Sequence, residues 1–484
     1  MASDRGVTPR SEDYNRWYND VVQKAELADY APVRGCMIIL PYGYELWEAV
    51  RSSLDRRFKE TGHRNAYFPL FIPESFLKKE AEHVEGFSPE LAVVTIGGGK
   101  QLEEPLIVRP TSETIIGYAY AKWIQSYRDL PVLINQWANV VRWEMRTKLF
   151  LRTMEFLWQE GHTAHATHDE AEAETLQMLD VYADMAIHDA AIPVIKGRKS
   201  NQEKFPGALR SYTIEAMMGD RRSLQSGTSH NLGQNFARAF DIKYLDENNV
   251  LQYCWTTSWG LSTRFVGAIV MTHGDDQGLR LPPKLAPYQV VIVPIFKDED
   301  EKSAVMEAVH RVQTALKEAG LRVHVDDREE HTPGFKFNDW EMRGVPLRVE
   351  IGPKDVRNES VALARRDIPG KAGRQFVPQA GIVEAVQRLL TEIQDNLLQQ
   401  ATAFRDAHIQ EVVGDYEAFG RIIRDGDWAL TWFCGDAACE QRIKEDYQCS
   451  SRCFPLEQPH PGEKGPCIAC EGQADEMAYF ARAY

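Results

Sequence analysis

The segment Val141–His162, with the sequence VRWEMRTKLFLRTMEFLWQEGH, constrains the fold more than any other part of the chain. Almost nothing in it interrupts a regular structure. Successive side chains of a strand point to opposite faces, so residues two apart share a face. The residues that would share faces are Arg142 with Glu144, and then Phe156 with Trp158 and Glu160. We therefore predict an antiparallel hairpin whose strands are joined by a mobile, charged tip at Met145–Phe150.

The inner face of this hairpin would present a guanidinium group, a carboxylate and aromatic rings. A guanidinium group binds phosphate or carboxylate through parallel hydrogen bonds and also stacks on flat rings. The pattern is therefore typical of a site for an anionic ligand. The alternative is a surface hairpin with ion pairs between its strands, and this segment alone does not distinguish the two.

Two other segments favour the anion site. VRPTSETIIG at Val108–Gly117 follows a strand-like run and begins a helix, with Thr111 and Glu113 able to point the same way. In WTTSWGLSTRFVGAIVMTHGD, Arg264 lies near the start of an apolar helix, where the helix dipole disfavours a cation. This placement indicates an anionic partner for Arg264, and a solvated arginine is the alternative.

The run LPPKLAPY at Leu281–Tyr288 contains three prolines and indicates a domain boundary. After it, Gln289–Phe296 is apolar enough for a buried strand, and Ala304–Gly320 spaces its apolar residues as a helix does. Further strand patterns, which complete a small α/β domain, lie at 321–327, 345–352 and 360–367. A long helical pattern from Ile382 towards Gln410 then leads to a cysteine-rich tail.

Composition limits the class of protein. With 43% hydrophobic and 10% aromatic residues, the 484-residue chain can build packed cores, and its length favours more than one domain. The net charge of −15 excludes a basic nucleic-acid footprint over the whole chain, so any such contact would come from local patches. No apolar run resembles a signal peptide or approaches a membrane span, and we expect a cytoplasmic protein without a membrane partner.

Six of the eight cysteines lie between Cys434 and Cys470, in CGDAAC, CSSRC and CIAC. Structural disulfides are rare in the cytosol, so these short spacings favour zinc. Four thiolates satisfy one tetrahedral site, yet six are present. A disulfide or redox role is the alternative.

These motifs together resemble those of a known family. RWE at Arg142–Glu144 resembles the second signature motif of class II aminoacyl-tRNA synthetases, GLSTRF around Arg264 the third, and ILPYGYELWEAV around Pro41 the first. RPTSE, FLWQEGHTAH, LQSGTSHNLGQNF and GVPLRVEIGPKD are similar to the archaeal and eukaryote-like form of prolyl-tRNA synthetases. The resemblance runs from about Asp13 to the last residue.

The resemblance implies an α/β multidomain protein. Its parts would be a class II catalytic core with an antiparallel β-sheet flanked by helices (1–285), an α/β anticodon-binding domain (286–398) and a small C-terminal α+β zinc-binding domain (399–484). It also implies a homodimer, because the first motif builds the dimer interface and closed two-fold symmetry is the general preference. The implied activity is that of a proline–tRNA ligase, which activates L-proline with ATP to prolyl-adenylate and pyrophosphate and then transfers the prolyl group to the 3′ end of tRNA(Pro).

The resemblance also implies a role for individual residues. Those implied in catalysis are Arg142 and Arg264. Those implied in proline binding are Thr111, Glu113, Arg142, Phe156, Trp158, His162 and His230. Those implied in binding ATP, with its Mg²⁺ ion, are Arg142, Glu144, Arg152, Thr153, Gln225, Thr228, Ser262 and Arg264. Those implied in anticodon binding are Glu341, Arg348 and Lys354, for each of which a solvated charged face is the alternative. The implied ligands of a structural Zn²⁺ ion are Cys434, Cys439, Cys467 and Cys470, which leaves Cys449 and Cys453 unassigned.

These roles agree with the chemistry of the residue types. The carboxylate of proline attacks the α-phosphate of ATP in line, and catalysis is mostly positioning and stabilisation of charge. No covalent nucleophile is needed. A neutral amide oxygen from Gln225 suits Mg²⁺, which prefers oxygen ligands and bridges phosphates.

The span from His162 to Ser258 is too short for the editing insertion of bacterial-type prolyl enzymes. We therefore expect that the chain does not hydrolyse mischarged alanyl-tRNA. A smaller amino acid enters a larger pocket at a penalty of only ~1–3 kcal/mol. Some alanine activation and a separate editing factor are the expected consequences.

Two rival functions stay open at this point. One is a class II synthetase for threonine or serine, although two aromatic residues beside Glu113 suit a ring-shaped imino acid better. The other is a paralogue that has lost catalysis and only binds tRNA, which the joint presence of Arg142, Arg264, Thr111 and Glu113 disfavours.

Overall fold

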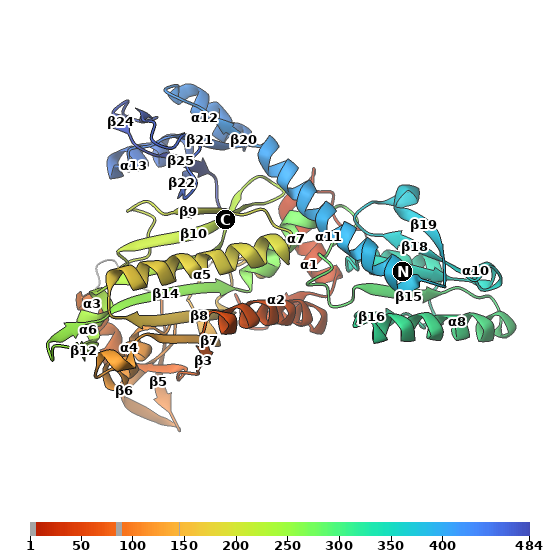
Figure 1. The fold of residues 1–484 in the computed structure, drawn as a ribbon, viewed down its shortest axis with the longest axis horizontal. Coiled ribbons are helices and arrows are strands. Elements are labelled where there is room, and N and C mark those ends of the chain that lie inside the picture. The colour runs from red at the N-terminus through yellow and green to blue at the C-terminus, as the bar shows by residue number, and fades with distance from the viewer. Residues whose placement is uncertain (1–5, 84–89, 145) are drawn as a thin grey trace.

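The computed structural model describes residues 6–83, 90–144 and 146–484, so the predicted tip residue Met145 lies outside it. Figure 1 shows a sheet with covering helices at the lower left, a second sheet with helices at the right, and a small body at the top. The long helix α11 (Ile382–Ala407) runs from the second body towards the third. The second and third bodies follow the first along the chain, and α11 links them.

A mixed sheet forms the frame of the molecule. Its order in the described residues is β20-β21-β25-β22-β9-β10-β11-β14-β8-β7-β3. The strands from the N-terminal part of the chain are β3 (Arg64–Asn65), β7 (Val132–Val141), β8 (Glu155–His165), β9 (Ile195–Arg198), β10 (Arg210–Met217), β11 (Ser223–Gly233) and β14 (Trp255–Ser262). The strands from the C-terminal part are β20 (Ile409–Glu411), β21 (Trp428–Trp432), β22 (Ser450–Pro455) and β25 (Met477–Ala481). Antiparallel pairing of β8 with both β7 and β14 confirms the antiparallel core predicted from the sequence.

Shorter strands and helices surround this frame. The helices are α1 (Tyr14–Lys24), α2 (Pro41–Glu60), α3 (Glu74–His83), α4 (Glu113–Trp123), α5 (His168–His188), α6 (Asn235–Phe240) and α7 (Arg264–His273). The small sheets pair β1 (Ala28–Tyr30) with β2 (Met37–Ile39), β12 (Lys243–Leu245) with β13 (Leu251–Tyr253), and β6 (Lys100–Val108) with β4 (Phe71–Pro73) and β5 (Ala92–Gly97). The predicted helices after RPTSE and at Arg264 are confirmed as α4 and α7.

The two faces of the main sheet have different surroundings. On β8 and β14 the residues Gln159, Gly161, Trp259 and Leu261 point towards α2 and α5, where Phe58 and Tyr182 meet the Trp259 ring at 4.9 and 6.4 Å between centroids. Gly161 lies opposite Trp259 in the register of the two strands. A Cβ atom on Gly161 would come within 2.0 Å of the Trp259 ring. One face of the sheet is therefore fully used by this aromatic core, and the alternate residues point to the other face.

The predicted hairpin is confirmed, but its tip differs from the prediction. β7 ends at Val141, so Arg142 and Glu144 lie just beyond the paired part of the strand. Residues 149–151 are at most 4% exposed and belong to the main apolar core. Burial of these apolar side chains outweighs the preference of the neighbouring basic residues for water. The prediction of a mobile, charged tip over Met145–Phe150 is therefore wrong at Leu149 and Phe150.

The second body has the predicted small α/β fold. Its sheet has the order β16-β15-β17-β18-β19, with β15 parallel to β16 and β17. The strands are β15 (Val290–Pro294), β16 (Val323–Val325), β17 (Leu347–Ile351), β18 (Ser360–Arg365) and β19 (Arg374–Pro378). The helices are α8 (Glu299–Glu318), α9 (Pro333–Met342), α10 (Pro353–Arg357) and the first part of α11. The guanidinium group of Arg366 binds the carboxylate of Asp275 through bonds of 2.6 and 2.8 Å, which ties this body to the catalytic part.

The third body continues the catalytic sheet. It contains α12 (Tyr416–Asp425), α13 (Ala437–Tyr447), β23 (Gly465–Pro466) and β24 (Gln473–Ala474) besides its four strands in the main sheet. β22 pairs with β9 through Phe454 and Arg198, and Gly197 permits the close approach because a Cβ there would lie 2.5 Å from Cys453. Strand pairing thus makes the third body an extension of the sheet that carries the site.

A buried charge cluster reinforces this junction. The Glu215 carboxylate on β10 accepts hydrogen bonds from Lys199 Nζ at 3.0 Å and from Arg452 Nε and Nη2 at 3.2 and 3.1 Å. The hydroxyl groups of Thr213 and Ser223 donate to it as well. Burial by itself raises the pKa of Glu215, but the charges of Arg452 and Lys199 outweigh it and lower the pKa to about 2. The carboxylate is therefore ionised inside the protein.

No helix in the described ranges combines the length and apolar character needed to cross a bilayer.

Replacement of Gly161 by alanine is expected to destabilise the fold. The added Cβ meets the Trp259 ring at 2.0 Å, and overpacking of this kind costs about 1–3 kcal/mol. Chemical denaturation should show this loss of unfolding free energy. Gly334→Ala is the matched control, because a Cβ at Gly334 meets no atom within 4 Å. Equal unfolding free energies for the two variants would contradict the packing described here.

The Glu215 cluster is expected to make stability depend on pH in the acid range. A carboxyl group whose pKa is lowered by folding adds stability above its unfolded pKa, and this stability is lost as pH falls towards the folded value. Wild type should therefore lose about 3 kcal/mol between about pH 5 and pH 2 through Glu215. Glu215→Gln should be less stable at neutral pH, because it leaves Lys199 and Arg452 without their anion, and the gap to wild type should narrow as pH falls.

Urea denaturation between pH 7 and pH 3 measures this gap. Glu247→Gln, at an exposed position, is the control and should follow wild type at every pH. A gap between wild type and Glu215→Gln that stays constant over this range would contradict the assigned ionisation.

Candidate functional site

Two adjoining cavities lie on the face of the sheet opposite the aromatic core. Their volumes are about 300 and about 270 Å³. The residues that line both cavities are Arg142, Trp158, Gln225, Thr228 and Gly260. The site is therefore one chamber with two compartments, and a ligand in either compartment reaches the Arg142 guanidinium group.

Arg142 is held in place by its surroundings. Its backbone N–H donates to Met154 O at 2.8 Å, and its Nε donates to Pro110 O at 3.1 Å. The guanidinium carbon lies 5.4 Å from the ring centroids of both Phe156 and Trp158. Burial lowers the pKa of Arg142, while the carboxylates of Glu113 and Glu160 oppose that shift. The group remains a cation aimed between the compartments.

The first compartment gathers three guanidinium groups, those of Arg142, Arg152 and Arg264. Arg264 Nε donates to Leu151 O at 2.9 Å, so the buried tip loop positions this side chain. Burial and the charges of Arg152 and Arg142 lower the pKa of Arg264 to about 10. Like charges brought together in a cavity favour a polyanionic ligand. Arg152 lies 3.6 Å from Glu144, which lines the same compartment.

The second compartment combines carboxylates with imidazole rings. The Thr111 hydroxyl donates to the Glu113 carboxylate at its edge, where α4 begins. His162 Nε2 lies 2.9 Å from Glu160 Oε2. Burial lowers the pKa of His162, but the hydrogen bond to Glu160 and the charges of Glu113 and Glu160 outweigh it and raise the pKa above its ordinary value. The compartment thus presents anionic groups that suit a small cationic ligand.

Glu160 is the centre of a buried network that the sequence predictions did not assign to the site. Its carboxylate accepts the Ser112 backbone N–H at 3.0 Å, the Ser112 hydroxyl at 2.5 Å and Gln136 Nε2 at 3.0 Å. Burial raises the pKa of Glu160, but these hydrogen bonds and that of His162 lower it overall. The network fixes the start of α4, and with it Thr111 and Glu113. Glu160 lies on the same strand face as Trp158 and His162, and this alternation in the sequence could have assigned it to the site.

His230 lies at the far wall of the second compartment. Its Nδ1 is 2.8 Å from Ser211 Oγ and its Nε2 is 3.1 Å from Thr228 Oγ1. The Phe205 ring packs against it at 4.8 Å between centroids. Burial and the charges of Lys199 and His162 lower the pKa of His230 to about 3, so the imidazole is neutral.

A bulge in β11 brings Gln225 and Thr228 to the same face of the sheet. Residues three apart on a regular strand point to opposite faces. In the register with β10, Glu215 pairs with Gln225 and Ile214 with Gly227, so Ser226 is an extra residue. Both side chains therefore line both compartments.

The structure brings most of the predicted residues together. Those that line the first compartment are Arg142, Glu144, Arg152, Thr153, Phe156, Trp158, Gln225, Thr228, Ser262 and Arg264. Those that line the second are Thr111, Glu113, Arg142, Trp158, His162, Gln225, Thr228 and His230. Phe156, assigned from the sequence to the proline ring, lies in the first compartment instead. The lining residues that the sequence predictions missed include Glu160, Lys199, Phe205, Ser211 and Ser258.

Of the predicted anticodon residues, two meet and one lies apart. Arg348 donates to Glu341 at 3.0 Å and to Glu350 at 3.1 Å, and its guanidinium group lies 4.0 Å from the Phe337 ring centroid. Glu341 and Arg348 line a cavity of about 380 Å³ together with Arg374 and Lys371. Lys354 does not line this cavity and is exposed on α10.

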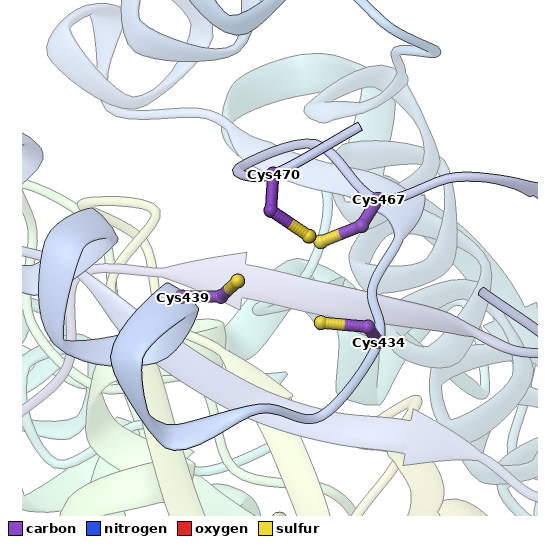
Figure 2. A group of neighbouring side chains, drawn as sticks. All are labelled: Cys434, Cys439, Cys467 and Cys470. Carbon is purple, nitrogen blue, oxygen red and sulfur yellow. The ribbon is translucent and has the colours of Figure 1, made fainter. Parts of the chain in front are cut away.

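Four cysteines of the third body form a cluster. The Sγ atoms of Cys434, Cys439, Cys467 and Cys470 all lie within 4.8 Å of one another, and Figure 2 shows the thiols pointing towards a common centre. Four thiolates bound to one Zn²⁺ at ~2.3 Å would lie ~4 Å apart, so the arrangement fits this ion. Cys449 and Cys453 are buried elsewhere, and burial raises the pKa of each thiol to about 12.

Residues 162–258, the span between two site residues, contain strands of the main sheet, the helices α5 and α6, the short β12–β13 pair and connecting segments. No further globular unit is inserted in this span.

Three regions of the chain match known protein families. Residues 95–273 match the tRNA synthetase class II core domain (G, H, P, S and T), residues 289–389 the anticodon binding domain, and residues 416–484 the C-terminal domain of prolyl-tRNA synthetase.

Whole-chain relatives point in the same direction. The chain is 60% identical over 480 residues to Proline--tRNA ligase of Chloroflexus aurantiacus, covering 99% of both chains. It is 58% identical over 487 residues to the chloroplastic/mitochondrial Proline--tRNA ligase of Arabidopsis thaliana, covering 100% of this chain and 89% of the relative. The crystal structure of Cryptosporidium parvum prolyl-tRNA synthetase complexed with L-proline and AMP matches with a TM-score of 0.94 and 38% identity, covering 100% and 98%. The chain thus belongs to the prolyl-tRNA synthetase family, whose members join proline to tRNA at the expense of ATP.

Proposed function

We propose that the first compartment holds ATP, that the second holds L-proline, and that Arg142 binds both reacting groups. The observation that carries this proposal is the position of Arg142 in the wall common to both compartments. A guanidinium group there can donate to the α-phosphate and to the proline carboxylate at once. The resulting alignment favours in-line attack of the carboxylate on the α-phosphate, with pyrophosphate as the leaving group.

The remaining residues of the first compartment act on the nucleotide. Arg152 and Arg264 bind the triphosphate, and Glu144, Thr153 and Ser262 orient the nucleotide by hydrogen bonds. Phe156 flanks the nucleotide side of Arg142, in keeping with its position in this compartment. Arg264 has little to neutralise its charge before the ligand binds, because its backbone acceptor is neutral, so it contributes attraction for the phosphates. Arg142 and Arg264 together are the catalytic residues of this proposal.

Proline selection rests on the second compartment. Glu113, aligned by Thr111, accepts the positive imino group, and the Trp158 ring encloses the pyrrolidine ring beside His162 and His230. Glu113 is only 8% exposed, so its interaction with a cation is weakly screened.

Two metal ions complete the proposal. Gln225 and Thr228 offer oxygen atoms to a Mg²⁺ ion that would neutralise phosphate charge when bound with ATP. The four cysteines of the cluster hold a structural Zn²⁺ ion, which would contribute folding free energy and leaves no open position for catalysis.

The second step uses tRNA(Pro), whose 3′ hydroxyl attacks the adenylate carbonyl. We place the anticodon at the cavity lined by Glu341 and Arg348, where the Phe337 ring can stack on a base, and Lys354 at its approach. The binding should weaken as salt rises, because the chain is acidic overall and relies on local basic patches.

The assembly proposed is a cytoplasmic homodimer formed through the region around Pro41. The domains are 1–285, 286–398 and 399–484, supported by separate apolar cores in the second and third bodies. The boundary at 398/399 falls within α11, which makes this helix a rigid connection. Without an inserted unit in residues 162–258, clearance of alanyl-tRNA is left to a separate editing factor.

Arg142→Ala is expected to lower the rate of proline-dependent pyrophosphate exchange by at least about 10²-fold, since removal of one donor to a developing charge commonly costs that much. The assay is run with proline, threonine and serine in turn. Arg128→Ala, at an exposed arginine, is the control and should retain the wild-type rate. An Arg142→Ala enzyme with wild-type exchange would refute the proposal, and exchange with threonine or serine in place of proline would refute the assigned substrate.

Zinc analysis by atomic emission is expected to find one Zn²⁺ ion per chain. Cys467→Ala should lose the ion and unfold at a lower temperature, because metal affinity is coupled to folding. Cys449→Ala, which removes a thiol outside the cluster, should retain it. Full zinc content in Cys467→Ala would show that the cluster is not the binding site.

A further inference from the structure

A wall of the second compartment consists of a segment without helix or strand, residues 199–209, between β9 and β10. Its residues that line the compartment are Lys199, Glu203, Lys204, Phe205 and Pro206. None of them lines the first compartment. The position of this segment therefore affects the shape of the proposed proline site without touching the nucleotide site.

The end of the segment is attached to the catalytic sheet. The backbone N–H of Phe205 donates to Ser211 Oγ at 2.9 Å, and that of Leu209 donates to Asn231 O at 2.8 Å. These bonds join it to β10 and β11, beside His230. The backbone N–H of Lys199 donates to Ser211 O at 2.8 Å, so the first residue of the segment is bonded to β10 as well.

The side chain of Lys199, at the start of the segment, is linked to the third body through Glu215 of β10. Arg452 on β22 binds the Glu215 carboxylate, which in turn binds Lys199 Nζ at 3.0 Å. Glu215 is fully buried and Arg452 is 6% exposed, so solvent screens the contact little. The positive charge of Arg452 thus helps to keep Glu215 ionised, and the Glu215 carboxylate in turn binds the ammonium group of Lys199.

A second attachment lies at the next residue. The Ser200 hydroxyl donates to Glu440 Oε1 on α13 at 3.0 Å, and it accepts the backbone N–H of Glu203 at 3.2 Å. The Ser451 hydroxyl donates to the same Glu440 oxygen. Glu440 is only 5% exposed, so its contact with Ser200 is buried inside the protein and does not lie on the surface. Two elements of that body therefore act on two consecutive residues of the wall: α13 binds Ser200 directly, and β22 acts on Lys199 through Glu215.

We propose that Arg452 and Glu440 are positioning residues for proline binding, through which the third body holds the 199–209 segment in the shape that closes the second compartment. This inference rests on the proposed function, because it assigns proline to that compartment. If the segment is loosened, it must become ordered when proline binds, and the lost conformational entropy weakens proline binding. ATP binding is not weakened in this way, because the segment does not line the first compartment. The third body thereby contributes to selection of the amino acid, although none of its side chains contacts the ligand.

Ser200→Ala and Arg452→Met test the inference, with KM measured separately for proline and for ATP in pyrophosphate exchange. We expect KM for proline to rise about 5–50-fold in each variant, and KM for ATP to change less than twofold. Arg452→Lys, which keeps the charge beside Glu215, should recover most of the loss. Arg421→Met, on an exposed arginine of α12 in the same body, should match wild type.

Limited digestion with trypsin supplies a readout independent of turnover. Cleavage after Lys204 should be faster in Ser200→Ala than in wild type, and saturating proline should slow it in both. Ser200→Ala removes one hydroxyl and leaves the Glu215 cluster intact, so it carries the test if Arg452→Met does not fold. Equal rises in the two KM values, or unchanged KM for proline with unchanged cleavage, would overturn the inference. Wild type without proline-dependent exchange would instead refute the proposed function, so the two failures are distinguishable.

Discussion

The alternation of side chains across the antiparallel sheet is the constraint on which the site depends. Trp259 and its neighbours fill the face towards α2 and α5, and this commits the intervening residues to the opposite face. Because Gly161 has no side chain, the Trp259 ring can pack directly against it. A slip of one residue would exchange the two sets and bury the site residues in the aromatic core. Packing on one face therefore determines the chemistry available on the other.

The open face then carries charges that burial would ordinarily disfavour. Each is compensated by groups from several elements, as Glu160 is by Ser112, Gln136 and His162. Arg142 and Arg264 are less compensated, because the acceptors of their Nε atoms, Pro110 O and Leu151 O, are neutral carbonyls; for Arg142 the charges of Glu113 and Glu160 offset part of the cost of burial. A preorganised cation of this kind attracts an anionic ligand and needs little reorganisation when charge develops. The compensated carboxylates and the less compensated arginines thus divide the chamber into a cation-binding and an anion-binding part.

The third body is part of the same construction. It extends the sheet through β22, supplies the counter-charge of Arg452 to Glu215 and holds Ser200 through Glu440. One cysteine of its cluster, Cys439, is the neighbour of Glu440 in α13. The small C-terminal domain is therefore joined to the amino-acid side of the chamber, while the Arg366–Asp275 pair joins the second body to the catalytic part at another place.

Local patterns in the sequence determined the hairpin, the helices after RPTSE and at Arg264, and the α/β fold after the proline-rich run; short cysteine spacings favoured a zinc site, while the family resemblance selected four of the six cysteines. These follow from side-chain periodicity and short spacings, which need no knowledge of distant neighbours. Tertiary structure alone decided the bulge at Ser226, the place of Phe156, the burial of Leu149 and Phe150, and the link between Glu215 and Arg452. Each of these depends on strand register or on charge pairing across more than a hundred residues, or on which surfaces become buried together, and a linear pattern does not contain that information.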